Sequence, residues 1–483
     1  MKKPTTTRRD ALRQIGLLGV TGTAALGLAA QTATAQTAAV PAPAPSGNQG
    51  ALSSREGFLA ELKQRVDSTL MVDSHEHLPD EAARLAERKS CLCLFRWYLG
   101  DDFVSAGLEG DIDALCGVTE KDDLVGAWRQ LEPYWNAVKN TGYGNAVQIT
   151  LKELYGIDTM SESAIPRLQQ EYARLAVPGF YEKVLRGHCR IECCQVDACR
   201  PQAETAHPTL LLQDINIRDF QSAHFTKDWG ARVGVSEIKD LSAYHDFMRR
   251  WFKKYGPYAV AVKSNFAYNR GLDYEKVPAE AVEGLFQKIL VQTPLTPEEK
   301  KRLEDHLFWF CVDLADEQNL PVKLHTGYYA GRNGMPVSRV ERNVAQVADL
   351  CLKSPKTRFV FMHTAYPYGH GLISVAKHFS NAHVQMCWAW IIDPIASKDF
   401  LKRHIVAAPS NKIHTFGGDY GNVENVVGHA RIARDGIYAA LSELVDEGYV
   451  SRANALELVD PLLRGNARRI FNLEQKYERA RNG

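Results

Sequence analysis

The sequence predicts an α/β protein, a (β/α)8 TIM barrel with a large helical insertion after its first strand. Short apolar, β-branched runs alternate with longer segments of helical period, and eight such runs follow one another. Polar side chains gather at the carboxyl ends of these runs, which is where a barrel carries its active site. This placement favours a barrel over the structural alternative, a doubly wound parallel sheet.

The eight predicted strands are residues 69–77, 190–197, 209–216, 258–265, 320–325, 358–363, 383–390 and 412–419. Helices are predicted between them, among others over residues 241–255, 297–318 and 339–353. About 110 residues separate the first two strands, far more than an ordinary βα connection. Residues 79–189 are therefore predicted to form a helical insertion, either a lid that bears substrate contacts or a structural elaboration.

The N-terminal segment is predicted to be a signal and not part of the fold. The pair Arg8 and Arg9 precedes a weakly apolar run and an A-x-A cleavage site at residues 33–35. The pair resembles a twin-arginine signal, which implies bacterial export to the periplasm or beyond; an ordinary signal or a retained anchor is the alternative. The predicted organisation is residues 1–35 as signal peptide, 36–54 as flexible tether and 55–483 as the barrel with its insertion.

Composition excludes several classes of protein. The 58 Lys and Arg nearly balance the 57 Asp and Glu, for a net charge of +1, so no nucleic-acid partner is expected. No apolar run of about 18 residues occurs, so no stable membrane insertion is expected after signal removal. The ten cysteines are predicted to be mostly buried free thiols. The partner expected from these features is a small-molecule substrate, and a homo-oligomer is left open.

Polar residues at the strand ends form the candidate site. Alternation along a strand places His75 and His77 on one face, and Lys323 and His325 on one face. Buried polar groups need partners, and a divalent metal would satisfy such a cluster. The residues predicted to converge on the barrel mouth are His75, His77, Lys263, Lys323, His325, His363 and Asp419.

The ordered set of these residues resembles the amidohydrolase superfamily. The residues that carry the resemblance are His75-x-His77, His325, His363 and Asp419, each at the end of the appropriate strand. Further stretches are similar to the amidohydrolase-related branch that includes nodulin-like and glutamine-synthetase-fused members. They are residues 262–268, 323–327, 361–367, 388–390 and 464–471.

Two positions depart from the pattern of that branch. Arg270 lies one position later than the arginine that commonly follows the strand-four lysine, which is expected to redirect its side chain. Gly418 precedes Asp419 where a threonine is common. Both departures concern substrate recognition more than the metal.

The metal ligands are predicted to be His75, His77, His325 and Asp419. Neutral imidazole suits a borderline ion, so Zn²⁺ is expected. One ion is favoured because these ligands leave an open position for water, with a two-ion site as the alternative. Asp419 is also the predicted catalytic general base; the alternative is a helix N-cap.

His363 is the second predicted catalytic residue, either as a ligand of a second ion or as a hydrogen-bonding group at the substrate oxygen or water. Lys263, if carboxylated, would bridge two ions; as an ammonium it would bind a substrate carboxylate, aided by Lys323. Arg270 is the third residue assigned to substrate binding. Structural pairing with Glu76 or Asp419 is the alternative for the lysines.

Three functions fit these features. The first is a metal-dependent hydrolase in which metal-activated water attacks a C–N or C–O bond of a small, anionic substrate. The second is a metal-dependent lyase or isomerase on the same barrel, since non-oxidative decarboxylases and uronate isomerases resemble this architecture. The third is a non-catalytic binding barrel, which would have no need of Asp419 in a proton-transfer position.

Overall fold

The computed structural model describes residues 54–197 and 207–482. The predicted signal peptide and all but the last residue of the predicted tether lie outside the described residues. The strands are β1 (Met71–Glu76), β2 (Ile191–Val196), β3 (Leu211–Gln213), β4 (Ile215–Asn216), β5 (Val262–Ser264), β6 (Val322–Leu324), β7 (Phe359–Phe361), β8 (Ala382–Gln385) and β9 (Ile413–His414).

These strands form a closed parallel barrel. They pair side by side in chain order, as β1-β2-β3 and β4-β5-β6-β7-β8-β9. Only Asp214 separates β3 from β4, so the two are one interrupted strand and the barrel has the predicted eight. The ring closes because the segment after β9 returns to β1: Asp419 N donates to His75 O at 2.9 Å, and His77 N donates to Tyr420 O at 3.0 Å.

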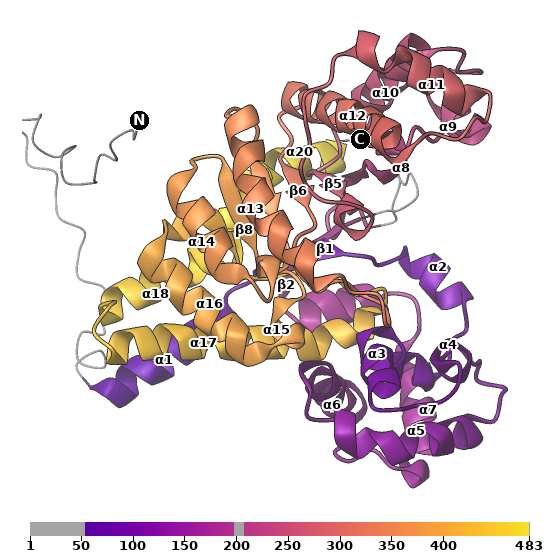
Figure 1. Ribbon diagram of the computed structural model, residues 1–483. Helices are drawn as coiled ribbons and strands as arrows, with labels where there is room; N and C mark the ends of the chain where they lie inside the picture. Colours follow the sequence, from indigo (N-terminus) through magenta and orange to yellow (C-terminus); the bar gives the residue numbers. More distant parts are fainter. Residues whose placement is uncertain (1–53, 198–206, 483) are drawn as a thin grey trace, which may run out of the picture. The chain divides into compact units, whose positions relative to one another are not determined.

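Helices surround the barrel (Figure 1). Outside the insertion they are α1 (Arg55–Ser68), α8 (Arg218–Gln221), α9 (Lys227–Arg232), α10 (Leu241–Tyr255), α11 (Glu283–Leu290), α12 (Pro297–Glu317), α13 (Val337–Lys353), α14 (Gly369–His378), α15 (Ala389–Ile392), α16 (Pro394–Ala407), α17 (Val426–Asp446), α18 (Arg452–Asp460), α19 (Asn466–Ile470) and α20 (Leu473–Asn482). Local sequence signals determine where such a helix begins. At the start of α12, Thr296 and Glu299 form a capping box around Pro297.

The insertion between β1 and β2 is helical, as predicted. It contains α2 (Glu81–Ala86), α3 (Trp97–Ser105), α4 (Ile112–Cys116), α5 (Leu124–Val138), α6 (Gly142–Tyr155) and α7 (Ile165–Leu175). It packs closely on the barrel, since a Cβ on Gly428 of α17 would lie 1.8 Å from Ala146 O of α6. The insertion therefore shares its core with the barrel helices.

The predicted strands are longer than the observed ones, and two of them run on into the barrel mouth. Strand 383–390 ends at Gln385, and α15 starts inside the predicted range. Strand 412–419 keeps strand geometry only at Ile413–His414. Trp388 and Asp419 have φ of 63° and 61°, and this left-handed backbone does not fit a strand. Both departures lie at the barrel mouth, where such conformations are typical of functional sites.

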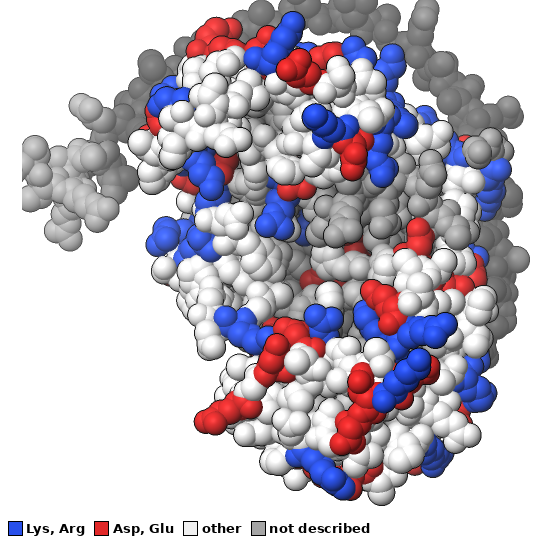
Figure 2. Space-filling view, turned by 90° about the vertical axis from the view of Figure 1, so that its right-hand side faces the viewer, with Lys and Arg blue, Asp and Glu red and all other residues white. Residues whose placement is uncertain are grey.

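The described cysteines confirm the expectation of buried free thiols. All nine are free and buried. No helix among the described residues is long and apolar enough to cross a membrane. On the face that Figure 2 shows, basic and acidic side chains of the described residues are interspersed.

Candidate active site

A cavity of about 530 Å³ lies at the carboxyl end of the barrel strands. Strand-end residues form its inner wall: His77, Lys263, His325, His363 and Asp419. The insertion forms a second wall: Arg96, Trp97, Tyr98, Asp101 and Asp113. Five of the seven residues predicted to converge at the barrel mouth therefore line one cavity.

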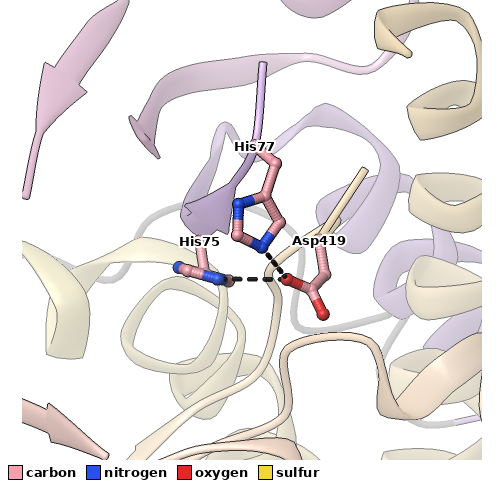
Figure 3. A group of neighbouring side chains, drawn as sticks. All are labelled: His75, His77 and Asp419. Carbon is pink, nitrogen blue, oxygen red and sulfur yellow. Dashed lines mark ion pairs between the residues drawn. The ribbon is translucent and has the colours of Figure 1, made fainter. Parts of the chain in front are cut away.

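His75, His77 and Asp419 form a compact group (Figure 3), and His77 and Asp419 line this cavity. His75 and His77 lie two residues apart at the end of β1 and point to the same side, as predicted. Asp419 Oδ1 lies 3.0 Å from His75 Nε2 and 3.3 Å from His77 Nε2. One ligand atom from each residue lies within 4.8 Å of the others, so the three can hold one ion.

The chemical state of this group fits a divalent cation. Both ring nitrogens of His75 are buried and make no hydrogen bond within the described residues. Burial, together with the charge of Lys263, lowers the pKa of His75 well below its usual value. Burial alone would raise the pKa of Asp419, but His75 and His77 hold it well below its usual range. Neutral imidazole and ionised carboxylate are the forms that bind metals.

The insertion fixes the backbone of Asp419. Trp97 Nε1 donates to Asp419 O at 3.2 Å, and Tyr98 OH donates to the same oxygen. These bonds support a residue whose φ is positive, a conformation that costs energy for a non-glycine residue. Sequence reasoning missed this support because about 320 positions separate donor and acceptor, and no local pattern links them.

His363 lies beside this group in a defined orientation. Its Nδ1 donates to Cys387 O at 3.0 Å, so in the neutral ring Nε2 keeps its lone pair. Burial lowers the pKa of His363 to about 4, which keeps the ring neutral. His363, Cys387 and Asp419 form a second group able to hold an ion, and the sequence did not single out Cys387 for this role.

His325 lines the cavity but joins neither group. Its Nε2 lies 2.8 Å from Tyr328 O, to which it donates, and its ring centre lies 4.4 Å from that of His363. Ligation through Nε2 would require this hydrogen bond to break. In this geometry His325, the remaining predicted metal ligand, lies beside the two ion-binding groups and belongs to neither.

The structure does not bring the three residues predicted to bind substrate together. Lys263 lines the cavity. Lys323 is fully buried at a deeper level of the barrel, where Nζ donates to Asp214 Oδ2 at 2.7 Å and Ser74 O at 2.8 Å. Arg270 points away from the cavity lining and pairs with Asp305 at 2.6 Å.

A buried acid pair explains the glycine before Asp419. The carboxyl groups of Asp73 and Glu76 lie against each other, and burial raises the pKa of Asp73 to about 6. Burial and the charge of Asp73 raise the pKa of Glu76 well above its usual value, which favours the neutral form of Glu76. A Cβ on Gly418 would lie 1.8 Å from Glu76 Oε1. Threonine cannot fit at this position beside Glu76.

Charged pairs join the insertion to the loop after β6. Arg332 Nε lies 3.0 Å from Asp101 Oδ1, and a second nitrogen of Arg332 lies 3.2 Å from Asp113. Arg96 contacts the same Asp113 at 2.9 Å. Deeper, Arg84 of the insertion pairs with Glu424 at 2.6 Å, with both side chains buried. These contacts join the insertion to the loop after β6 and to the segment before α17.

Comparison with known proteins places the fold and the family. An amidohydrolase family model matches residues 215–473, more than half of the chain. No curated protein matches in sequence.

Three solved structures are similar. They are a uronate isomerase from Thermotoga maritima (TM-score 0.70, 14% identity, covering 88% of this chain and 99% of that one), a glucuronate isomerase from Caulobacter crescentus (0.70, 16%, 89% and 96%), and a protein from Lactobacillus casei provisionally named a metal-dependent hydrolase (0.60, 15%, 86% and 98%). At these identities the likeness concerns the fold alone. The family match is the finding that identifies the protein: the chain belongs to the amidohydrolase family.

Proposed function

We propose that the protein is a metal-dependent hydrolase that cleaves a C–N or C–O bond of a small, anionic substrate. The observation that supports this most is the shared contact of Asp419 Oδ1 with His75 Nε2 and His77 Nε2 at 3.0 and 3.3 Å, beside an open cavity. We propose that these three residues hold one divalent ion, Zn²⁺, with the group around His363 as a second position.

When bound, such an ion supplies Lewis-acid chemistry: it polarises a substrate oxygen and lowers the pKa of water. The protein supplies the proton transfer. Asp419 Oδ1 faces His75 Nε2 and His77 Nε2, where an ion would be held, which leaves Oδ2 to accept a proton and later return it to the leaving group. His363 is neutral with a lone pair on Nε2, so it can accept a proton or bind an ion but cannot donate in this form.

An isomerase is the second candidate. The two uronate isomerases resemble this fold at a TM-score of 0.70, against 0.60 for the provisional hydrolase. In that reaction Asp419 Oδ2 would move a proton between carbon atoms of the substrate. The same cavity and the same three residues serve either reaction, so the chemistry of the product must separate them.

Isotope incorporation separates the two reactions. The purified protein is incubated in H₂¹⁸O with a panel of N-acyl amino acids, lactones and carboxylate-bearing esters, and in D₂O with D-glucuronate. We expect ¹⁸O in one hydrolysis product, loss of this activity after dialysis against a chelator, and recovery on adding Zn²⁺. Conversion of D-glucuronate to a ketose would establish the isomerase instead. Absence of bound metal, with no activation by added metal, would contradict both.

We also propose that the protein is exported by a twin-arginine route, on the basis of the Arg8–Arg9 pair and the cleavage site that follows. The variant in which both arginines become lysine keeps the charge but loses the guanidinium pair. We expect it to stay in the cytoplasm of a bacterial host, measured by fractionation and by retention of the signal. Undiminished export of this variant would point to a general secretory signal.

A further inference from the structure

We infer that Arg218 and Lys263 form a subsite for the carboxylate group of the substrate, and that Arg218 determines specificity for it. This inference rests on the proposed function only in so far as the bound carboxylate is called a substrate. The binding site itself stands on two neighbouring cations of the cavity wall that have no partner among the described residues.

Lys263 is a buried ammonium without an acceptor. The residue is 2% exposed and lines the cavity. Within the described chain no hydrogen bond or ion pair involves its Nζ, whereas the equally buried Lys323 has two acceptors. A buried charge is costly unless it is paired. The missing partner of Lys263 is therefore an anion that enters through the cavity.

Arg218 stands next to Lys263 on the same wall. In the barrel Asn216 of β4 pairs with Lys263 of β5, and Ile217 N donates to Lys263 O at 2.9 Å. The side chain of Asn216 fixes the turn that follows, because its Oδ1 accepts from Arg218 N at 2.8 Å and its Nδ2 donates to Asp197 at 2.7 Å. Arg218 is exposed and lines the cavity, and its guanidinium has no partner in the described residues.

The other two cations of the cavity are already neutralised. Arg96 contacts Asp113, and Arg332 contacts both Asp101 and Asp113. An incoming anion would have to displace these carboxylates, whereas it meets no competitor at Arg218 and Lys263. The positive charge available to a ligand is thus confined to one place, beside the ion-binding group.

The chemistry of the pair points to a carboxylate. A guanidinium binds a planar carboxylate through two parallel hydrogen bonds, and an ammonium adds a point charge on the same group. Asn265, two residues after Lys263, also lines the cavity and has a buried side-chain oxygen without a donor. A substrate hydroxyl or N–H next to the carboxylate would satisfy it. The expected substrate is a small carboxylate with such a donor nearby.

Binding of matched ligand pairs tests the subsite without turnover. Titration calorimetry compares benzoate with benzamide, and D-glucuronate with D-glucuronamide, on the protein as purified and after dialysis against a chelator. We expect at least one carboxylate to bind more tightly than its amide in both preparations. Arg218→Met should weaken this carboxylate about 10-fold or more, the scale of a lost charged hydrogen bond. Arg302→Met, on the exposed face of α12, is the matched control and should bind as the wild type does.

Several outcomes would overturn the inference. They are equal affinity for carboxylate and amide, no binding of either carboxylate, or unchanged affinity in Arg218→Met. A ¹³C carbamate signal after exposure to ¹³CO₂, lost in Lys263→Met, would show that Lys263 is carboxylated and not free to pair with substrate. Failure of hydrolysis would leave the result intact, because binding is measured separately and after metal removal.

Discussion

Asp419→Asn should lower turnover about 100-fold or more while the protein keeps most of its metal. Asparagine has nearly the same size, and its side-chain oxygen can still occupy the position of Oδ1 between His75 and His77. What it loses is the ionised carboxylate that takes the proton. The backbone support from Trp97 and Tyr98 is directed at the carbonyl of residue 419, so it survives the substitution.

The contrast with the histidines makes this prediction specific. His75→Ala and His77→Ala each remove a nitrogen from the ion-binding group, so metal and activity should fall together. For all three variants, metal content is measured by elemental analysis and turnover is measured on one substrate. These measurements separate loss of turnover alone from joint loss of metal and turnover. A near-wild-type rate for Asp419→Asn would move the search for a base to His363. Glu76 is a poor alternative, since it is buried and lies against the carboxyl group of Asp73.

Gly418→Ala should destabilise the protein by about 3 kcal/mol, at the upper end for an overpacked core. The new Cβ would lie 1.8 Å from Glu76 Oε1, and Glu76 cannot withdraw easily. Its other oxygen accepts from Tyr420 N at 2.6 Å, and its carboxyl group rests against Asp73. The midpoint of urea unfolding should fall accordingly.

Two further variants separate the clash from a general effect of alanine. Gly284→Ala lies on the exposed side of α11, where a Cβ would meet nothing within 4 Å, and should be neutral or slightly stabilising. Glu76→Ala combined with Gly418→Ala removes the obstructing carboxyl and should recover part of the lost stability relative to Gly418→Ala. An unchanged unfolding midpoint for the single Gly418→Ala variant would show that the side chains of Asp73 and Glu76 can move aside without loss of stability.

The strand order and the strand-end residues could be predicted from the sequence because both depend on local patterns. Alternation along β1 is enough to place His75 and His77 on one face. Alternation does not indicate, however, how deep in the barrel the end of a side chain lies. Lys323 does point into the barrel, but its long side chain runs to Asp214 at a lower level, away from the cavity.

Contacts between distant segments could not be predicted in this way. Arg218 begins α8, just after β4, in a stretch that carries no motif, and only the pairing of β4 with β5 brings it beside Lys263. The support of Asp419 by Trp97 joins the insertion to the last strand. The family membership is confirmed, while the narrower branch, the zinc ion and the export route stay predictions.

The closure of the barrel has a consequence for biosynthesis. The backbone of β1 is bonded on one side by the segment around Asp419 and Tyr420, which the ribosome makes more than 300 residues later. Until then the nascent chain carries an open strand edge, and such edges invite pairing with other chains. The acceptor for Trp97 is also missing, as is α17, on which α6 of the insertion packs, so neither the packing of the insertion nor the ion-binding group is complete until then. We therefore expect a chain truncated before Asp419 to lack a complete ion-binding group.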